Sequence, residues 1–208
     1  MPAIKNPSTG SGHRPSTGSG HRKARVVVFC APSGSGKTTL VHSVLEKFDQ
    51  FSFSVSATNR ERRGNEIEGK DYYFLSSEEF LARVKRGEFL EWEEVYPGRY
   101  YGTLKKEVER ILAEGKNILF DVDVMGGISI KEYFGDLCLA IFIKPPSIPE
   151  LKRRLEKRGT DSAEEIARRI KKASREMVYA GNFDCQVTND DLEKAKIRVE
   201  KIVKARVH

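Results

Sequence analysis

One stretch decides the fold of this chain: Arg25-Val-Val-Val-Phe-Cys-Ala-Pro-Ser-Gly-Ser-Gly-Lys-Thr-Thr39. Its apolar run, Val26 to Cys30, predicts a buried strand, and the turn after it contains two glycines. Beyond the turn, apolar residues recur at helical spacing. Strand, glycine-rich turn and helix in this order predict a loop whose backbone N–H groups surround a phosphate at the helix N-terminus.

The chemistry of this loop points to a nucleoside triphosphate. Lys37 is expected to reach the β- and γ-phosphates, and the Thr38 hydroxyl to hold Mg²⁺. A flexible Gly/Ser turn is the alternative, and it is disfavoured because Gly-Lys-Thr follows the strand directly. Ala31 stands where the usual pattern has glycine, and alanine tolerates positive φ poorly, so we expect a slight change of loop geometry there. The predicted ATP-binding residues of the loop are Ala31, Pro32, Ser33, Gly34, Ser35, Gly36, Lys37, Thr38 and Thr39.

Length and composition limit the class of protein. The 208 residues suffice for one α/β domain with a small insertion. No apolar run approaches the roughly 18 residues of a membrane span, and the N-terminus lacks the apolar core of a signal peptide. The cysteines Cys30, Cys138 and Cys185 have no metal-ligand spacing and predict free thiols in a reducing cytosol. We therefore expect a cytoplasmic protein.

The net charge of +7 does not require a nucleic-acid partner. Residues 1–23 carry four basic residues and no acid, so the rest of the chain has an excess of only +3. Concentrated phosphates on a small ligand explain that excess as well as a polyanion does. Residues 1–23 also contain the duplicated segment Pro-Ser-Thr-Gly-Ser-Gly-His-Arg, which predicts a disordered tail.

The body of the chain alternates strand-like and helical segments, which predicts a parallel sheet of about five strands covered by helices on both faces. Strands are expected at 26–30, 51–56, 117–123, 137–143 and 185–188. Helices are expected at 37–47, 105–114 and 151–180, and Ser147 is expected to cap the third of these. A last amphipathic helix is expected after it, capped by Asn189 and Asp190. Residues 57–103 break this rhythm with short strand-like pieces and one helix capped by Ser76, and we interpret them as an insertion.

Polar residues gather where these strands end. Asp121 and Asp123 are two apart, so on a regular strand they share a face. Ligands of such sheets bind at the carboxyl ends of the strands, where the loop and both aspartates fall.

The insertion indicates the acceptor. Arg60 and Arg63 can grip a phosphate through their planar forks, with Tyr72 and Tyr101 as further donors. Glu91 lies inside an apolar run, where its carboxylate can accept the N1–H and N2–H₂ donors of guanine, whereas adenine presents an acceptor at N1. Each residue alone also fits a solvated charge or a polar group on a strand face, and it is their joint occurrence that favours a guanine site. Ser56 and Thr103 are candidate donors to guanine O6.

Together these segments resemble the guanylate kinase family over about residues 25–203, in family order. The segments that carry the resemblance are Ser56-Ala-Thr-Asn-Arg-Glu-Arg-Arg63, Glu66-x-x-Gly-x-Asp-Tyr72, Gly87-Glu-Phe-Leu-Glu-Trp92, Tyr100-Tyr-Gly-Thr103, Asp121-Val-Asp123, Pro145-Pro-Ser147, Arg158-Gly-Thr160 and Asn189-Asp-Asp-Leu192. The chain departs from the family pattern at Ala31, at Met125 and in the placement of Gly64, and none of these removes a side chain with an assigned role.

The resemblance implies a three-layer α/β/α P-loop kinase core, a small mixed GMP-binding insertion and a helical lid. These parts fall at 24–56 and 104–207 for the core, 57–103 for the insertion and about 153–175 for the lid, within a domain of residues 24–205. It assigns the GMP phosphate to Arg60, Arg63, Tyr72 and Tyr101, and the base to Ser56, Glu91, Thr103 and Asp123. It also adds Asn189 to the ATP site, and the magnesium ligands would be Thr38 and, through water, Asp121.

The arginines between residues 153 and 169 are candidates for clamping the transferring group. Arg154 and Arg158 are four apart and share a helical face, and Arg169 follows across the turn at Gly159. A solvated basic helix with glutamate partners is the equally weighted alternative. The resemblance places Arg154, Arg158 and Arg169 at functional positions of the lid, beside Lys37 as the catalytic set.

The implied activity is ATP-dependent, Mg²⁺-assisted phosphorylation of GMP and dGMP in purine nucleotide metabolism, with no protein nucleophile. One alternative is a non-catalytic guanylate-kinase-like module that binds phosphopeptides. Such modules typically lose the loop lysine or the lid arginines, which this chain keeps. Another nucleoside monophosphate kinase would lack the set of Glu91, Ser56 and Thr103. We expect no nucleic-acid or membrane partner, and the sequence leaves the oligomeric state open.

Overall fold

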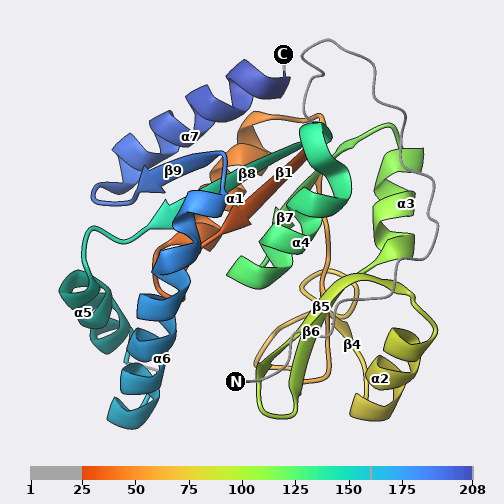
Figure 1. Ribbon diagram of the computed structural model, residues 1–208, viewed down its shortest axis with the longest axis horizontal. Coiled ribbons are helices and arrows are strands. Elements are labelled where there is room, and N and C mark those ends of the chain that lie inside the picture. The colour runs from red at the N-terminus through yellow and green to blue at the C-terminus, as the bar shows by residue number, and fades with distance from the viewer. Residues whose placement is uncertain (1–24, 160, 208) are drawn as a thin grey trace.

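The computed structural model describes residues 25–159 and 161–207 and is built around a five-stranded sheet (Figure 1). The strand order is β2-β7-β1-β8-β9, and all neighbouring pairs run parallel, which confirms the predicted sheet. The strands are β1 Val26–Cys30, β2 Phe51–Phe53, β7 Asn117–Asp121, β8 Cys138–Lys144 and β9 Cys185–Thr188. The predicted tail, residues 1–23, lies outside the described residues.

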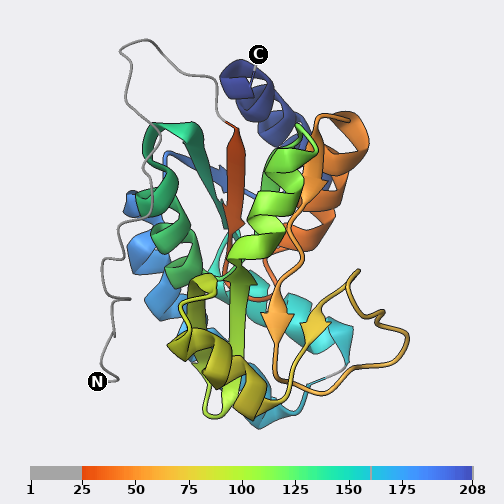
Figure 2. The ribbon, with the colours of Figure 1, turned by 90° about the vertical axis from the view of Figure 1, so that its right-hand side faces the viewer.

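Helices cover both faces of this sheet, because the side chains of each strand alternate between two apolar clusters. Val27 and Phe29 of β1 pack toward α1 (Lys37–Lys47) and α7 (Leu192–Val207). The alternate residues of β1 pack toward α3 (Lys105–Ala113) and α4 (Val124–Phe134). Figure 2 shows β1 in red between α1 in orange and α4 in green. The three-layer α/β/α arrangement is thus confirmed.

A second, four-stranded sheet is formed by residues 57–104, where the sequence predicts an insertion. Its order is β4-β3-β6-β5. The strands are β3 Ala57–Thr58, β4 Tyr73–Phe74, β5 Phe89–Tyr96 and β6 Arg99–Leu104. The helix α2 (Ser77–Lys85) packs through Phe80 on one face, and the predicted cap is present, since Ser76 Oγ accepts the Glu79 N–H at 3.1 Å.

Register shifts in β5 determine which residues face away from α2. Phe89 lies opposite Leu104 on the face covered by α2, and Glu91 lies opposite Thr103. In a regular strand Phe89 and Glu91 would share a face, but the β-bulge between them turns Glu91 to the other side. The buried carboxylate is therefore directed away from the small apolar cluster of this sheet and toward the core.

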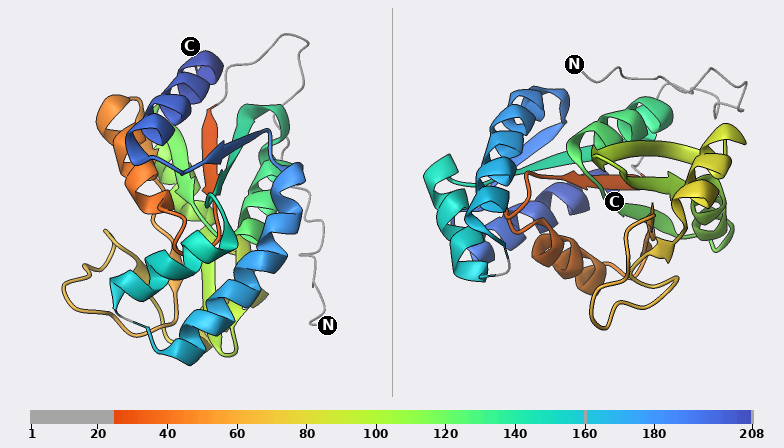
Figure 3. Two further views of the ribbon diagram at one scale, coloured as in Figure 1. Left: turned by 90° about the vertical axis from the view of Figure 1, so that its left-hand side faces the viewer. Right: turned by 90° about the horizontal axis from the view of Figure 1, so that it is seen from below.

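Two helices follow β8 in the region predicted to be helical, 151–180, and they lie on either side of the turn predicted at Gly159. They are α5 (Ile148–Arg158) and α6 (Ala163–Glu176), and the 3-10 turn η2 (Met177–Asn182) continues from α6. The break comes at Gly159, whose φ of 68° ends α5 in the left-handed conformation. Figure 3 shows the pair α5–α6 extending from the carboxyl edge of the core sheet. The predicted Ser147 cap is present, with Oγ accepting from the Glu150 N–H at 3.2 Å.

The prediction that Asp121 and Asp123 share a face of one strand was wrong. Strand β7 ends at Asp121, and Asp123 is the N-cap of α4, with Oδ1 accepting the Gly126 N–H at 2.9 Å. The predicted strand was too long because the α4 sequence was not recognised as a helix. A short 3-10 turn, η1 (Gly135–Leu137), links α4 to β8.

The predicted cap of the last helix was also misplaced. Asp191 caps α7, because its Oδ1 accepts the Lys194 N–H at 3.0 Å. Asn189 reaches the glycine-rich loop instead. The cysteines of the described part of the chain are free thiols, as expected, and two of the three are fully buried. Among the helices of residues 25–159 and 161–207, none combines the length and apolar character needed to cross a bilayer.

Close packing of α4 on β1 gives the first prediction. A Cβ atom at Gly127 would overlap the Cys30 Sγ, so Gly127→Ala is expected to destabilise the fold by about 1–3 kcal/mol in urea unfolding. The matched control is Gly181→Ala, because a Cβ at Gly181 meets no described atom within 4 Å. Cys30→Ala in the Gly127→Ala background should restore stability. Equal unfolding midpoints for Gly127→Ala and Gly181→Ala would contradict this packing argument.

Candidate functional site

The glycine-rich loop presents free backbone donors at the start of α1. Gly34 and Gly36 have φ of 91° and 83°, which only glycine adopts without strain. Gly36 is the N-cap of α1, and no side chain of the described residues caps this helix. The first-turn N–H groups are therefore available to an anion, where the helix dipole adds to the attraction.

Lys37 is held at this point by two groups at the end of β7. Its Nζ donates to the Val122 carbonyl at 2.7 Å and forms an ion pair with Asp121. Burial alone would lower the pKa of Lys37, but the Asp121 carboxylate raises it above the ordinary value of lysine. The ammonium is thus kept charged. Thr38 Oγ1 lies 3.4 Å from Asp121 Oδ2, so the two predicted magnesium ligands are neighbours.

The loop tolerates Ala31 without strain. Among the described residues, positive φ occurs only at glycines, and Ala31 packs in the apolar cluster beneath α1. The slight change of loop geometry expected from alanine therefore has no basis in this conformation.

Asn189 connects the loop to α5. Its Nδ2 donates to the Ser35 carbonyl at 2.8 Å, and a Cβ at Gly36 would collide with the same amide. Arg154 donates to the Asn189 carbonyl at 2.9 Å and pairs with Glu150 at 3.0 Å. Of the predicted clamping arginines, Arg154 is thus linked to the loop through Asn189.

The other two predicted arginines differ in position. Arg169 of α6 donates to Ser33 Oγ at 2.8 Å and to Asp161 Oδ1 at 3.0 Å, so it lies at the edge of the phosphate loop. Its Nε is buried and has no hydrogen-bond partner among the described residues. Arg158 is exposed at the end of α5, and no other described residue pairs with it. The structure brings Arg169 to the site and leaves Arg158 in solvent.

A buried carboxylate occupies the second half of the site. Glu91 is 8% exposed and accepts a hydrogen bond from Thr103 Oγ1 at 2.7 Å. A Cβ at Gly126 would come within 2.7 Å of Glu91 Oε2 and 3.3 Å of Asp123 Oδ1, so both carboxylates lie against α4 where it has no side chain. Burial, with the charge of Asp123 as the second cause, raises the pKa of Glu91 to about 8.

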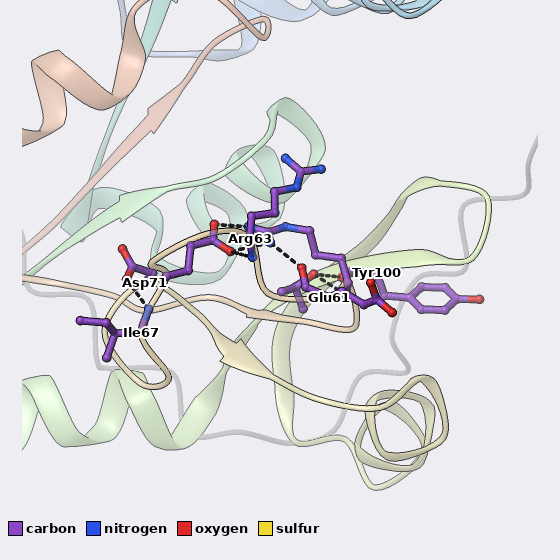
Figure 4. A network of polar contacts seen from close by, with 8 residues as sticks. Glu61, Arg63, Ile67, Asp71 and Tyr100 are labelled. Atoms are coloured by element: carbon purple, nitrogen blue, oxygen red, sulfur yellow. Dashed lines mark hydrogen bonds and ion pairs between the residues drawn. The ribbon is translucent and has the colours of Figure 1, made fainter. Parts of the chain in front are cut away.

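The predicted phosphate-binding arginines, Arg60 and Arg63, lie on the loop between β3 and β4, and Figure 4 shows Arg63 there. Arg60 is engaged by Glu66, whose two carboxylate oxygens accept from its Nη atoms at 2.7 and 2.5 Å. These hydrogen bonds lower the pKa of Glu66 to about 2. Arg60 also stacks 4.8 Å above the ring of Tyr72, which in turn lies edge-on to Tyr101 at 6.0 Å.

The same loop borders an arginine-rich hollow of about 470 Å³. Four of its lining residues are arginines: Arg60, Arg62, Arg63 and Arg99. Arg63 has an exposed side chain, and its backbone is bound to Glu66: its N–H donates to the Glu66 carboxylate at 2.8 Å and its carbonyl accepts the Glu66 N–H at 3.0 Å. Ser56 is half-buried at the start of β3, with its carbonyl accepting from Tyr73 N–H at 2.9 Å. The Ser56 hydroxyl contacts none of the other predicted base-binding residues in the described chain.

This geometry agrees with the comparison to known proteins. The family model described as guanylate kinase matches residues 23–206. The chain belongs to the guanylate kinase family. A guanylate kinase of Porphyromonas gingivalis is 54% identical over 86% of this chain and 96% of its own length. One from Bacteroides fragilis is 52% identical, covering 88% of this chain and 89% of the relative.

A solved structure supports the same assignment at the level of fold. The crystal structure of guanylate kinase from Anaplasma phagocytophilum is 32% identical, covers 88% of this chain and 86% of its own, and has a TM-score of 0.71. The family resemblance drawn from the sequence is therefore confirmed. The roles of the individual site residues stay predictions.

Several members of the site in this guanylate kinase family chain were not singled out from the sequence. Glu66 accepts hydrogen bonds from the Arg60 guanidinium. It lies six residues further along a loop, and this spacing gives no periodic signal in the sequence. Glu93 follows Glu91 at the spacing of a strand face, which was a usable signal. Lys172 follows Arg169 by one helical turn on α6, which was another.

The raised pKa of Glu91 predicts a pH-dependent stability. The folded chain binds this proton up to about pH 8 and the unfolded chain only up to about pH 4.5, so stability falls as pH rises between these values. From pH 5 to pH 8, wild type should lose on the order of 3 kcal/mol relative to Glu91→Gln in urea unfolding. The exposed Glu109→Gln serves as the control. Parallel pH profiles for wild type and Glu91→Gln would refute the assignment.

Proposed function

We propose that this member of the guanylate kinase family transfers the γ-phosphoryl group of ATP to GMP or dGMP, forming ADP and the guanosine diphosphate, in purine nucleotide metabolism. One observation carries the choice of acceptor: Glu91 is buried beside Asp123, and its described side-chain donor is Thr103. Guanine would supply the missing donors through N1–H and N2–H₂, and these hydrogen bonds favour the ionised carboxylate over the protonated form that burial favours in the free protein. Adenine would set an acceptor against the carboxylate. Cytoplasmic location stays a prediction.

The ATP phosphates would lie in the glycine-rich loop. The free N–H groups of the first turn and the Lys37 ammonium would face the β- and γ-phosphates. Asn189 holds the loop through its hydrogen bond to the Ser35 carbonyl. The neighbouring oxygens of Thr38 and Asp121 suit a hard cation such as Mg²⁺, with Asp121 acting through water. When bound, Mg²⁺ would neutralise phosphate charge. Lys37 would exchange its partner Asp121 for phosphate oxygens.

GMP would lie between the two sheets. Glu91, Thr103, Ser56 and Asp123 would surround the base, and Arg60, Arg63, Tyr72 and Tyr101 its phosphate. Because Glu66 already pairs with Arg60, it would orient the guanidinium, leaving the remaining donors for phosphate oxygens. Arg63 has a free side chain in the described structure and would supply a second fork.

Transfer would proceed in line. An oxygen of the GMP phosphate forms the new bond to the γ-phosphorus while the bond to the β,γ-bridging oxygen breaks, and ADP leaves with that electron pair. Arg169, which contacts the loop at Ser33, and Arg154 would stabilise the charge of the transferring group. Arg158 would join them only after movement of its helix. We assign 153–175 as the lid, 57–103 as the GMP-binding insertion, and 24–56 with 104–207 as the core.

A non-catalytic phosphopeptide-binding role is disfavoured, because the side chains expected to take part in phosphoryl transfer are present. Lys37 is charged, Thr38 lies beside Asp121, and Arg169 lies on the loop. Nothing in the described residues replaces them by apolar or acidic side chains.

Loss of the loop lysine should abolish transfer. Lys37→Ala is expected to lower kcat at least 10³-fold while the fold is kept, because it removes the charge at the transferring phosphates. The matched control is Lys47→Ala, an exposed lysine at the end of the same helix. Coupled assays of ADP formation and thermal unfolding would measure both effects. Turnover within about tenfold of wild type would contradict this role of Lys37.

Base selectivity should depend on Glu91. In a panel of GMP, dGMP, AMP, UMP and dTMP, wild type is expected to use the first two, and Glu91→Gln to raise the KM for GMP by about 10²-fold with little change for ATP. The reason is that an amide offers one acceptor where the carboxylate offers two. An equal loss for both nucleotides would remove Glu91 from the base site, and a preference for AMP would overturn the proposed acceptor.

A further inference from the structure

The helix α6 faces both halves of the site. Arg169 reaches Ser33 of the phosphate loop, and Lys172 lies one helical turn further along the same face. The Lys172 Nζ lies 3.5 Å from Glu176 Oε1, on the next turn, and both side chains are largely buried. Figure 1 shows α6 and the β5–β6 hairpin extending on the same side of the core sheet.

Lys172 also contacts the hairpin that carries the base site. Its Nζ lies 5.5 Å above the ring of Tyr96, and Arg168 Cζ lies 4.7 Å above the same ring. A positive charge over a phenol ring is attracted by the electron density of the ring face. These contacts are direct ties between α6 and the second sheet.

The direction of Tyr96 is set by the second bulge in β5. Glu94 lies opposite Tyr100 and Tyr96 opposite Arg99, so one residue is extra on β5. Without it, Tyr96 would share the α2 face with Glu94; the bulge turns it to the face of Glu91 instead. Strand β5 thus directs Glu91, the proposed guanine-binding carboxylate, and Tyr96, which contacts α6, to the same side of the sheet.

Three carboxylates, those of Glu93, Asp123 and Glu176, act electrostatically on Lys172. Glu93 is on the same face as Glu91, and its Oε2 is buried without a hydrogen-bond partner in the described residues. Burial, then the charge of Asp123 and a hydrogen bond with it, raises the pKa of Glu93, whereas Lys172 acts in the opposite direction. The charges of Glu176, Asp123 and Glu93 in turn raise the pKa of Lys172 against the effect of its burial. Lys172 thus pairs with Glu176 on its own helix and lies over Tyr96, on the face of β5 that also carries Glu91 and Glu93.

We propose that Lys172 is a positioning residue for phosphoryl transfer, which joins α6 to the base site through Tyr96, Glu93 and Asp123 and so sets Arg169 over the phosphates when both nucleotides are bound. The inference rests on the proposed function. Arg169 and Lys172 are on one rigid helix, so docking Lys172 on the base-site carboxylates fixes the distance of Arg169 from the phosphate loop. Lys172 itself need touch neither nucleotide.

The test compares six proteins. They are wild type, Lys172→Met, Lys172→Arg, Lys171→Met, Tyr96→Phe and Tyr96→Ala. Lys171→Met removes an exposed lysine next to Lys172 on α6 and serves as the matched control. Kcat and KM for GMP and ATP are measured, together with the Kd of GMP with and without a saturating non-hydrolysable ATP analogue. Urea unfolding checks that the variants are equally folded.

Lys172→Met is expected to lower kcat about tenfold with less than about a twofold change in KM for ATP, because the clamp is misplaced while ATP binding is kept. It should also remove the tightening of GMP binding by the ATP analogue, and Lys172→Arg should restore most of both. Tyr96→Phe, which keeps the ring, should behave as wild type, whereas Tyr96→Ala should resemble Lys172→Met.

The inference is overturned if Lys172→Met has the kcat of Lys171→Met, if its loss follows only from unfolding, or if wild type shows no coupling between the nucleotides. In these cases wild type still phosphorylates GMP and the proposed function stands. If wild type does not phosphorylate GMP at all, the proposed function fails, and this inference falls with it.

Discussion

A buried ammonium group at the end of the central sheet is the constraint from which the site follows. Lys37 lies in the first turn of α1, where the helix dipole repels a cation, and its side chain is mostly buried. It is tolerated because β7 lies next to β1 in the sheet and ends at Asp121, with the Val122 carbonyl beside it. The strand order thus places the anion that keeps Lys37 charged, and the same carboxylate lies against Thr38.

The chain then continues from that carboxylate to the second half of the site. Asp123 turns the backbone into α4 and caps it, and Glu91 approaches from the other sheet to the same turn. The residues proposed to bind the phosphates and the base are therefore linked by three consecutive residues, 121–123. Two bulges in β5 complete this arrangement by turning Glu91 and Tyr96 to the side of the core.

Features set by short-range chemistry could be predicted from the sequence. The phosphate loop, the caps at Ser76 and Ser147 and the parallel core each depend on neighbouring residues or on a simple period. Helix α4 was not predicted from the sequence. Its residues are apolar on most sides and include two adjacent glycines, a composition that does not favour a helix in isolation. The two bulges in β5 could not be predicted, because the register of a strand depends on its partner strand. The ion pair of Lys37 with Asp121 and the contact of Lys172 with the Tyr96 ring join segments far apart in sequence, and only the folded chain shows them.

The absence of a side chain at Gly126 has a consequence for how such a protein can be altered. The proposed base site lies between Glu91 of the inserted sheet and the bare backbone of a core helix at Gly126, with Asp123 beside it. Grafting residues 57–103 onto another kinase core would carry Glu91 and Thr103 along but leave half of the pocket behind. The proposed guanine preference is in this sense a shared property of two modules, and we expect it to pass to a chimera only when the recipient's core helix also begins with an acidic cap and a glycine one turn later.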